Sequence, residues 1–375
     1  MKKSTTRKAS NSLLSKKMRR QIHSQAAQER LTVGLDLGDR QSRYCVLSER
    51  GEVVIAEALP TTKTGLNHLF ERMPRSRVVL EVGTHSPWVS RHLAGLGHEV
   101  IVANPRKVAL ISHSRQKDDR LDAEKLARLG RVDPQLLGPI RHRGEQAQAD
   151  LMLIRARGAL VEARTSLINT ARGLVKSMGE RLNCCDSEGV GPELADKLSP
   201  RVRGAVEPLL RSVARLSEEI AVYDAQIKPL EKRYPEVELL KQVHGVGTLV
   251  ALTFVLTLED PSRFAHSREV GPYLGLQPRH RDSGESQPQL GISKEGDGDL
   301  RWLLVQAAHC ILRQGAPDSD LRRWGLARME RGGKSARRKA VVGVARKLAV
   351  LLHRLWVSGE TYEPLYQSQR KRAAA

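Results

Sequence analysis

The order of short apolar runs between residues 31 and 103 constrains the fold of this chain most strongly. Three strand-like runs joined by Gly-, Asp- and Arg-rich turns come first, and two more strand-like runs follow, each after a stretch with helical spacing. The strand-like runs are residues 31–37, 43–48, 52–58, 77–82 and 98–103, and the helical stretches are 65–73 and 88–96. The first three runs predict an antiparallel meander.

Three strands, a helix, a strand, a helix and a strand follow the element order of a ribonuclease-H-like sheet, which predicts an α/β domain over residues 31–143. Residues 144–176 and 193–232 are rich in Leu, Ala, Arg and Glu at helical spacing. They predict two long helices joined by a loop at 184–192, forming an antiparallel or intermolecular coiled-coil stalk over residues 144–235. The predicted fold class is therefore α/β plus all-α.

The remaining segments are a basic flexible arm at residues 1–30, a compact helical domain at 236–330 and a basic C-terminal helical segment at 331–375. In the helical domain, Gly245 and Gly247 separate two apolar helical runs. This spacing fits a helix-hairpin-helix turn, whose backbone N–H groups can meet a phosphate. Such a glycine pair is also common in ordinary tight turns.

The charge balance indicates a polyanionic partner. Lys and Arg number 63 and Asp and Glu 42, which gives a net charge of +21. DNA and RNA are the polyanions that offset such self-repulsion, although an unrelated basic enzyme is an alternative. Only 3% of residues are aromatic, so recognition by rows of stacked rings is disfavoured.

The cysteines and apolar segments predict the compartment. The four cysteines contain no C-x-x-C pair, and the adjacent Cys184 and Cys185 suit neither a zinc site nor an ordinary disulfide framework. The longest apolar stretch, residues 248–258, is shorter than the roughly 18–20 residues of a membrane span, and the basic N-terminus lacks a signal peptide's apolar core. We expect a cytoplasmic, nucleoid-associated bacterial protein with no membrane partner.

Four acids carry the candidate chemistry. Asp36 and Glu81 end the first and fourth strand-like runs, which are neighbours in the predicted sheet. Asp119 and Asp122 are spaced i,i+3 at the start of a helix, so they share one helical face. Carboxylates gathered in one pocket repel one another unless divalent cations lie between them, and Mg²⁺ prefers such oxygen ligands. Singly, each acid is equally well explained as a helix cap or surface group.

Residues 34–38, Gly-Leu-Asp-Leu-Gly, have a competing interpretation as the phosphate loop of an actin-like or sugar-kinase ATPase. The sequence has no later Gly-rich adenosine loop and no second matching half-domain. The metal-binding interpretation is therefore favoured.

With these acids in this order, the region resembles the RuvC-like DEDD domain of the IS110 family of insertion-sequence transposases. The C-terminal half strengthens the resemblance, which runs from about residue 33 to residue 356. It carries segments similar to that family's second transposase domain at residues 238–247, 260–264, 273–279 and 291–297.

The resemblance implies DNA recombination directed by an element-encoded bridge RNA, with donor and target DNA as further partners and a homo-oligomer, dimer or tetramer. It implies that Asp36, Glu81, Asp119 and Asp122 bind Mg²⁺. It also implies a serine nucleophile that forms a covalent phosphoserine-DNA intermediate, which by motif position is Ser283.

Composition alone does not separate Ser283 from Ser286 and Ser293. The Ser283-Gly284 step lets a hydroxyl approach a phosphate, and nearby arginines supply positive potential. We expect phosphate contacts from six basic residues: Lys117, Arg120, Arg279, Arg281, Lys294 and Arg301.

Two alternative functions stay open from the residues. A RuvC-like, metal-dependent, structure-selective resolvase would hydrolyse DNA with water and would not need Ser283. A non-catalytic nucleic-acid-binding protein would use the acids only structurally.

Overall fold

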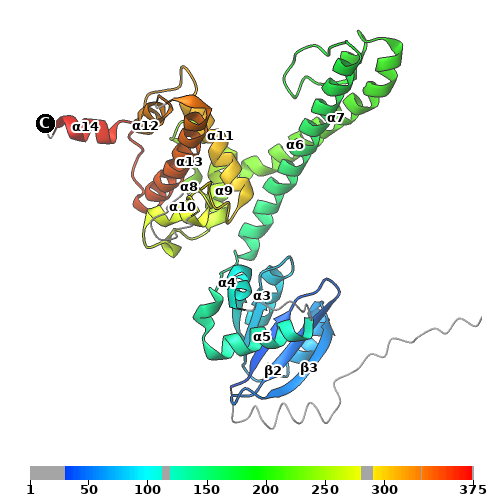
Figure 1. Ribbon diagram of the computed structural model, residues 1–375, viewed down its shortest axis with the longest axis vertical. Helices are drawn as coiled ribbons and strands as arrows, with labels where there is room; N and C mark the ends of the chain where they lie inside the picture. Colours follow the sequence, from blue (N-terminus) through cyan, green and yellow to red (C-terminus); the bar gives the residue numbers. More distant parts are fainter. Residues whose placement is uncertain (1–29, 112–118, 280–289, 331, 374–375) are drawn as a thin grey trace, which may run out of the picture. The chain divides into compact units, whose positions relative to one another are not determined.

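The structure is a computed structural model that describes residues 30–111, 119–279, 290–330 and 332–373 (Figure 1). The chain divides into two compact units, Met1–Arg143 and Gly144–Ala375, which we describe separately. The first unit holds a five-stranded sheet and the second is helical, which confirms the predicted combination of an α/β part and an all-α part. In the described ranges, no helix is long and apolar enough to span a bilayer.

The sheet of the first unit has the order β3-β2-β1-β4-β5. β1 pairs antiparallel with β2, β2 pairs antiparallel with β3, and β4 pairs parallel with both β1 and β5. The antiparallel meander and the predicted neighbours β1 and β4 are therefore confirmed. The strands are β1 (Thr32–Asp36), β2 (Gln41–Leu47), β3 (Val53–Pro60), β4 (Arg77–Glu81) and β5 (Glu99–Ala103).

Helices cover both faces of this sheet. α2 (Lys63–Phe70) and α3 (Ser86–Gly95) bury Leu66 and Val89 against β1 residues such as Val33 and Leu35. On the opposite face, α5 (Asp119–Val132) buries Ala123 and Ala127 against Cys45 and Leu47 of β2. The two remaining helical segments of the unit are α4 (Pro105–Ile111) and η1 (Pro134–Leu137).

A long helical hairpin opens the second unit. α6 (Glu145–Ser177) and α7 (Pro200–Ile227) run antiparallel, because Arg157 pairs with Asp224 at 2.9 Å while Arg164 donates to the Ser217 hydroxyl at 3.1 Å. The prediction of one helix over residues 193–232 was wrong at both ends. Pro192–Ala195 and Lys228–Arg233 form separate 3₁₀ turns, η2 and η3, and Pro200 begins α7, since proline suits the first turn of a helix.

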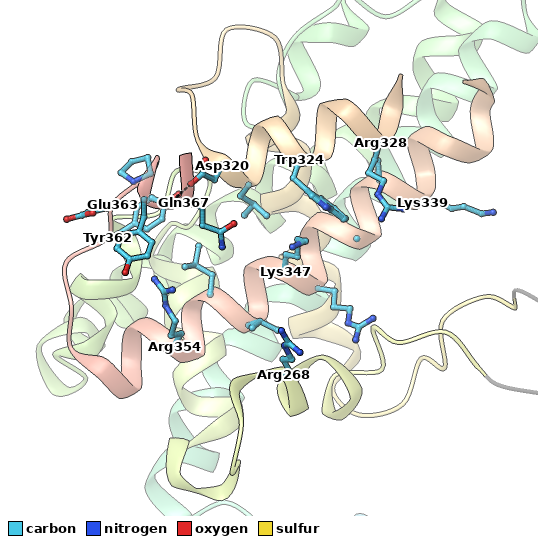
Figure 2. Close-up of a pocket in the computed structure, with 18 of the residues that line it drawn as sticks. Arg268, Asp320, Trp324, Arg328, Lys339, Lys347, Arg354, Tyr362, Glu363 and Gln367 are labelled. Atoms are coloured by element: carbon cyan, nitrogen blue, oxygen red, sulfur yellow. Dashed lines mark hydrogen bonds between the residues drawn. The ribbon is translucent and has the colours of Figure 1, made fainter. Parts of the chain in front are cut away.

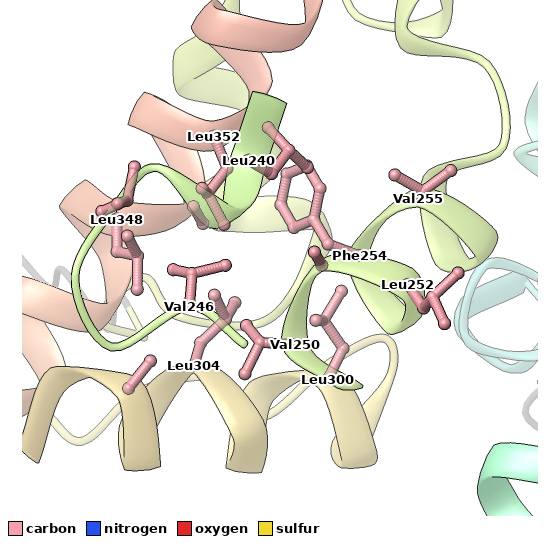
Figure 3. Packing of buried hydrophobic residues seen from close by; sticks show 14 of the residues in the cluster. Leu240, Val246, Val250, Leu252, Phe254, Val255, Leu300, Leu304, Leu348 and Leu352 are labelled. Atoms are coloured by element: carbon pink, nitrogen blue, oxygen red, sulfur yellow. The ribbon is translucent and has the colours of Figure 1, made fainter. Parts of the chain in front are cut away.

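The rest of the second unit is a compact group of helices around one core. Figure 3 shows Leu240, Val250, Phe254, Leu300 and Leu348 meeting there from α8, α9, α11 and α13. The elements are α8 (Glu236–Lys241), α9 (Thr248–Leu258), η4 (Pro261–Arg263), η5 (Ser267–Glu269), α10 (Val270–Tyr273), α11 (Gly298–Leu312), α12 (Asp320–Met329), α13 (Gly333–Ser358) and α14 (Tyr366–Ala373). The predicted basic C-terminal helical segment at 331–375 forms α13 and α14 within the described residues.

The glycine pair forms the turn between α8 and α9. Gly245 adopts a φ of 85°, and a Cβ there would lie 2.9 Å from the Ala307 carbonyl of α11. Gly247 is the residue that precedes α9. The turn therefore needs glycine at 245 both for its left-handed backbone and for its close approach to α11.

Candidate active site

Two of the four acids lie side by side at the carboxyl edge of the sheet. Leu35 of β1 is paired with Leu80 of β4 in parallel register, and Asp36 and Glu81 are the next residues on each strand. Residues in register on adjacent strands project from the same face, at strand spacings of about 5 Å. Both acids are half-buried.

The face that carries these acids is the one that α5 covers. A Cβ on Gly34 would collide with the Ala123 carbonyl of α5, and Gly130 of α5 packs equally closely on Val79 of β4. Because side chains two residues apart on a strand share a face, Asp36 follows Gly34 and Glu81 follows Val79 onto the α5 side. The first turns of α5 carry Asp122, so the sheet and the helix bring acids to one place.

The electrostatics of Glu81 confirm this proximity. Its pKa is raised, first by burial of the carboxyl group and then by the negative charges of Asp36 and Asp122. Lys125, one turn further along α5, is 3.2 Å from the Asp122 carboxylate and compensates part of the charge. Three carboxylates held this way are hard oxygen donors of the kind a divalent cation prefers.

The fourth acid, Asp119, begins α5 one turn before Asp122, but its side chain and that of Arg120 lie outside the described residues, as does Lys117. Within the described ranges, no three His, Cys, Asp or Glu side chains lie close enough together to hold a metal ion. The carboxylates of Asp36, Glu81 and Asp122 have the donor chemistry that a divalent cation prefers, but the described residues do not bring three of them within metal-binding distance.

The loops that follow the two acidic strands are also joined, which the sequence reasoning missed. His85 lies after β4 and its Nε2 atom is 3.4 Å from a carboxylate oxygen of Asp39, which lies after β1. The Trp88 indole N–H donates to Nδ1 of the same His85 ring at 3.1 Å. No local pattern in the sequence signals this link, because the two residues are 46 positions apart.

Ser283, the predicted nucleophile, lies outside the described residues, and so do Arg281 and Ser286. The chain segments that flank this stretch are paired with each other in the second unit. Arg279 N–H donates to the Gly291 carbonyl at 3.0 Å, Ser293 N–H donates to Gln277 at 2.9 Å, and Pro278 and Ile292 form an antiparallel bridge. Residues 279 and 291 are thereby fixed next to each other.

Glycines make this pairing possible. Gly275 and Gly296 have φ values of 66° and 72°, and a Cβ on either residue would collide with backbone atoms of the opposite segment. Lys294 has a φ of 57°, although it is not glycine, and its N–H donates to the Gly275 carbonyl at 3.1 Å. The base of the Ser283 segment is consequently a close backbone-to-backbone contact.

The predicted phosphate contacts of this region differ in their surroundings. Arg279 and Lys294 are exposed, whereas Arg301 donates from Nη1 to the backbone carbonyls of Leu274 and Glu295 at 3.0 and 2.9 Å. Arg301 therefore also joins the two segments that flank residues 280–289. Arg155 of α6, which the sequence reasoning missed, forms an ion pair with Asp297 at 2.8 Å.

The chain matches two family models of known proteins. Residues 33–179 match the model of the DEDD transposase family, and residues 237–322 match that of the transposase IS116/IS110/IS902 family. The first match covers Asp36, Glu81, Asp119 and Asp122, and the second covers the segments that flank Ser283.

Transposases and a DNA-inverting protein match most of the length of this chain. The transposase for insertion sequence element IS1111A of Coxiella burnetii is 28% identical over 88% of this chain and 90% of its own length. A probable family 20 transposase of Pseudomonas aeruginosa is 26% identical over 88% of this chain and 98% of its own length. A pilin gene-inverting protein of Moraxella bovis is 25% identical over 76% of this chain and 80% of its own length.

The acid-bearing sheet, the helical second unit and these matches define a DNA-recombining enzyme of the transposase class. The chain belongs to the IS116/IS110/IS902 family of insertion-sequence transposases, as both halves match.

Proposed function

We propose that this transposase recombines DNA under the direction of a bridge RNA, using Mg²⁺ held by Asp36, Glu81, Asp119 and Asp122 and a covalent intermediate on Ser283. The observation that carries the proposal is the placement of Asp36, Glu81 and Asp122 on the α5 side of the sheet, where burial and then the charges of Asp36 and Asp122 raise the pKa of Glu81. The sheet order and the α5 cover support a RuvC-like, ribonuclease-H-like domain.

The serine step is a transesterification. The Ser283 Oγ attacks a DNA phosphorus, a phosphoserine bond forms, and the bond from phosphorus to a sugar oxygen breaks. The serine proton leaves, and the released sugar oxygen gains a proton. Because one ester replaces another, the intermediate keeps the energy needed to rejoin strands. Bound Mg²⁺ would polarise the phosphate and lower the charge that accumulates on it.

We propose that the enzyme acts as a dimer or tetramer, because strand exchange requires several strands to be cut and rejoined. The α6–α7 hairpin, with helices of 33 and 28 residues, has the length of an oligomerisation stalk. Size measurement of the complex with nucleic acid tests this point, and a monomer would contradict it.

The decisive experiment is capture of the tagged protein under denaturing conditions from cells that carry its native flanking DNA, followed by sequencing of attached DNA. Wild type, Ser283→Ala and Asp36→Ala are compared. Ser286→Ala is the matched control, since it removes a hydroxyl three residues away.

We expect attached DNA in wild type and Ser286→Ala and none in Ser283→Ala or Asp36→Ala. Cleavage that needs Asp36 but leaves no DNA attached would support the resolvase that uses water instead. Full DNA function in Asp36→Ala would support the non-catalytic alternative. Removal of the bridge RNA gene should abolish recombination at the native target.

A further inference from the structure

The second unit has a groove between α12 and α13, closed at one end by the segment that leads into α14 (Figure 2). It encloses about 1100 Å³. Six cationic side chains line it, namely Arg268, Arg328, Lys339, Arg346, Lys347 and Arg354, against two acids, Asp320 and Glu363. We call it the α12–α13 groove.

The cations of this groove are not balanced by nearby acids. α13 contains seven Lys or Arg residues and no Asp or Glu. None of the six lining cations forms an ion pair with an acidic side chain that the structure describes. The Asp320 carboxylate accepts hydrogen bonds from the backbone N–H groups of Gln367 and Ser368 instead of pairing with these cations. Such a concentration of like charge is unfavourable for folding and indicates an anionic ligand.

The spacing of the cations along α13 favours an elongated ligand. Lys339, Lys347 and Arg354 lie along one side of α13 at intervals of eight and seven residues, which correspond to about 12 and 10 Å of helix. The row is thus about 22 Å long. A single phosphate or a small metabolite would contact only part of it, whereas a polyanionic strand would contact all of it.

Aromatic rings lie beneath the cations. The Trp324 ring of α12 has the Lys347 ammonium 4.8 Å and the Arg328 guanidinium 5.1 Å from its centroid, and Arg354 lies 5.7 Å from the Tyr366 ring. Gly343 lets the indole approach α13, since a Cβ there would lie 2.8 Å from it. The cations over the ring supply positive charge for phosphates, and the part of the indole that lines the groove offers apolar surface against which an unpaired nucleobase can pack.

We propose that the α12–α13 groove binds a single-stranded polynucleotide, with its phosphates on Lys339, Lys347 and Arg354 and a base on Trp324. The inference rests on the proposed nucleic-acid function of the chain. It needs neither the acids nor Ser283, so binding measured without Mg²⁺ separates its failure from failure of the recombination chemistry.

The test is fluorescence anisotropy with the full chain in EDTA, using 12-nucleotide oligo-U RNA, oligo-dT DNA and a 12-base-pair duplex. The groove variant is Lys347→Gln with Arg354→Gln. The matched control is Arg201→Gln with Arg215→Gln, which removes the same charge from exposed positions of α7. Trp324→Leu and Trp324→Phe test the ring, and thermal melting checks that each variant is folded.

We expect single strands to bind more tightly than the duplex. The groove variant should lose two phosphate contacts, so the slope of log K against log salt should fall by about 1.4, while the control keeps its slope. Trp324→Leu should weaken binding about tenfold, and Trp324→Phe should weaken it less. Tighter binding of RNA would assign the groove to a guide strand, and tighter binding of DNA would assign it to a displaced strand.

Three results would overturn the proposal. These are a duplex that binds more tightly than single strands, a groove variant that behaves like the α7 control, and polyglutamate of equal charge that displaces the oligonucleotides as well as they displace one another.

Discussion

Gly34 is the residue at which α5 approaches the sheet most closely, and it lies two residues before Asp36. Gly34→Ala would place a Cβ against the Ala123 carbonyl, so α5 must move and carry Asp122 away from Glu81. We expect a loss of about 3 kcal/mol in unfolding free energy and loss of DNA capture. Gly95→Ala is the matched control, because a Cβ there meets open space, and it should be neutral or stabilising.

Glu81 should decide how the enzyme responds to divalent cations. Its raised pKa means that the fold disfavours the charged carboxylate, so this group destabilises the protein increasingly as pH rises through its folded pKa. Glu81→Gln should therefore raise the melting temperature of the metal-free protein at pH 8 by about 2–4 °C, and the difference should close near pH 4. Millimolar Mg²⁺ should stabilise wild type more than Glu81→Gln.

Calorimetry with and without Mg²⁺ provides this measurement. Glu57→Gln is a suitable control, since Glu57 lies on β3 and only its charge beside Tyr44 changes. An equal effect of Mg²⁺ on wild type and Glu81→Gln would contradict a metal site at this carboxylate.

At the residue scale, the acids could be predicted from the sequence because each ends an apolar strand or begins a helix. The sequence could not place them on the α5 face, since that depends on Gly34 of β1 accepting the α5 backbone and on Gly130 of α5 accepting the Val79 side chain. Neither could it find the link from His85 to Asp39, which joins residues 46 positions apart. Long-range contacts of this kind leave no local pattern.

The paired segments around residues 275 and 296 flank the segment that contains the proposed nucleophile Ser283. Gly296→Ala would force a residue with a Cβ into a φ of 72° and against the Tyr273 carbonyl. We expect at least a tenfold loss of covalent DNA capture, with the Mg²⁺-dependent stabilisation retained. Gly291→Ala, where a Cβ meets open space, should keep full capture. Equal capture by the two variants would show that this pairing does not position Ser283.

A buried carboxylate anchors α6 to the rest of the second unit. Asp150 is 4% exposed and accepts hydrogen bonds from Arg233 at 2.7 Å and Tyr234 at 2.7 Å. Burial opposes ionisation, but the Tyr234 and Arg233 hydrogen bonds outweigh it and hold the pKa of Asp150 below its ordinary 3.8. Asp150→Asn should lower the unfolding free energy by about 2 kcal/mol at pH 7.

The pH dependence of this difference follows from the direction of the shift. The contribution of Asp150 is complete above the ordinary pKa and is lost as pH falls through the lower folded pKa, so wild type and Asp150→Asn should converge below about pH 3.8. Urea titrations followed by tryptophan fluorescence report on this unit, which contains Trp302, Trp324 and Trp356. A gap that persists unchanged at pH 3 would contradict the assignment.

At the element scale, periodicity predicted the strands to within a few residues and both helices of the hairpin. It missed the start of α7. Residues 193–199 have a helical composition, but Pro192 begins the separate 3₁₀ turn η2 and Pro200 begins α7. Charge along a helix does not end it, whereas proline begins or interrupts it.

On the scale of the whole molecule, the surplus of 21 positive charges is unevenly compensated. On α7 and α12, arginines such as Arg203 and Arg323 are paired with Asp196 and Asp318. α13 carries no acid at all. Local pairing neutralises the first group, so the field that attracts a polyanion comes mainly from surfaces such as the α12–α13 groove.

Binding of nucleic acid should consequently depend steeply on salt. If six or more phosphates are contacted, the slope of log K against log salt should be about −4 or steeper, and affinity should fall at least about 250-fold between 50 and 200 mM salt. Dissociation constants measured across that range check this, with sodium glutamate replacing chloride as a control for anion competition. A flat dependence would mean that the surplus charge serves another purpose, because counterion release accompanies any phosphate contact made by Lys or Arg.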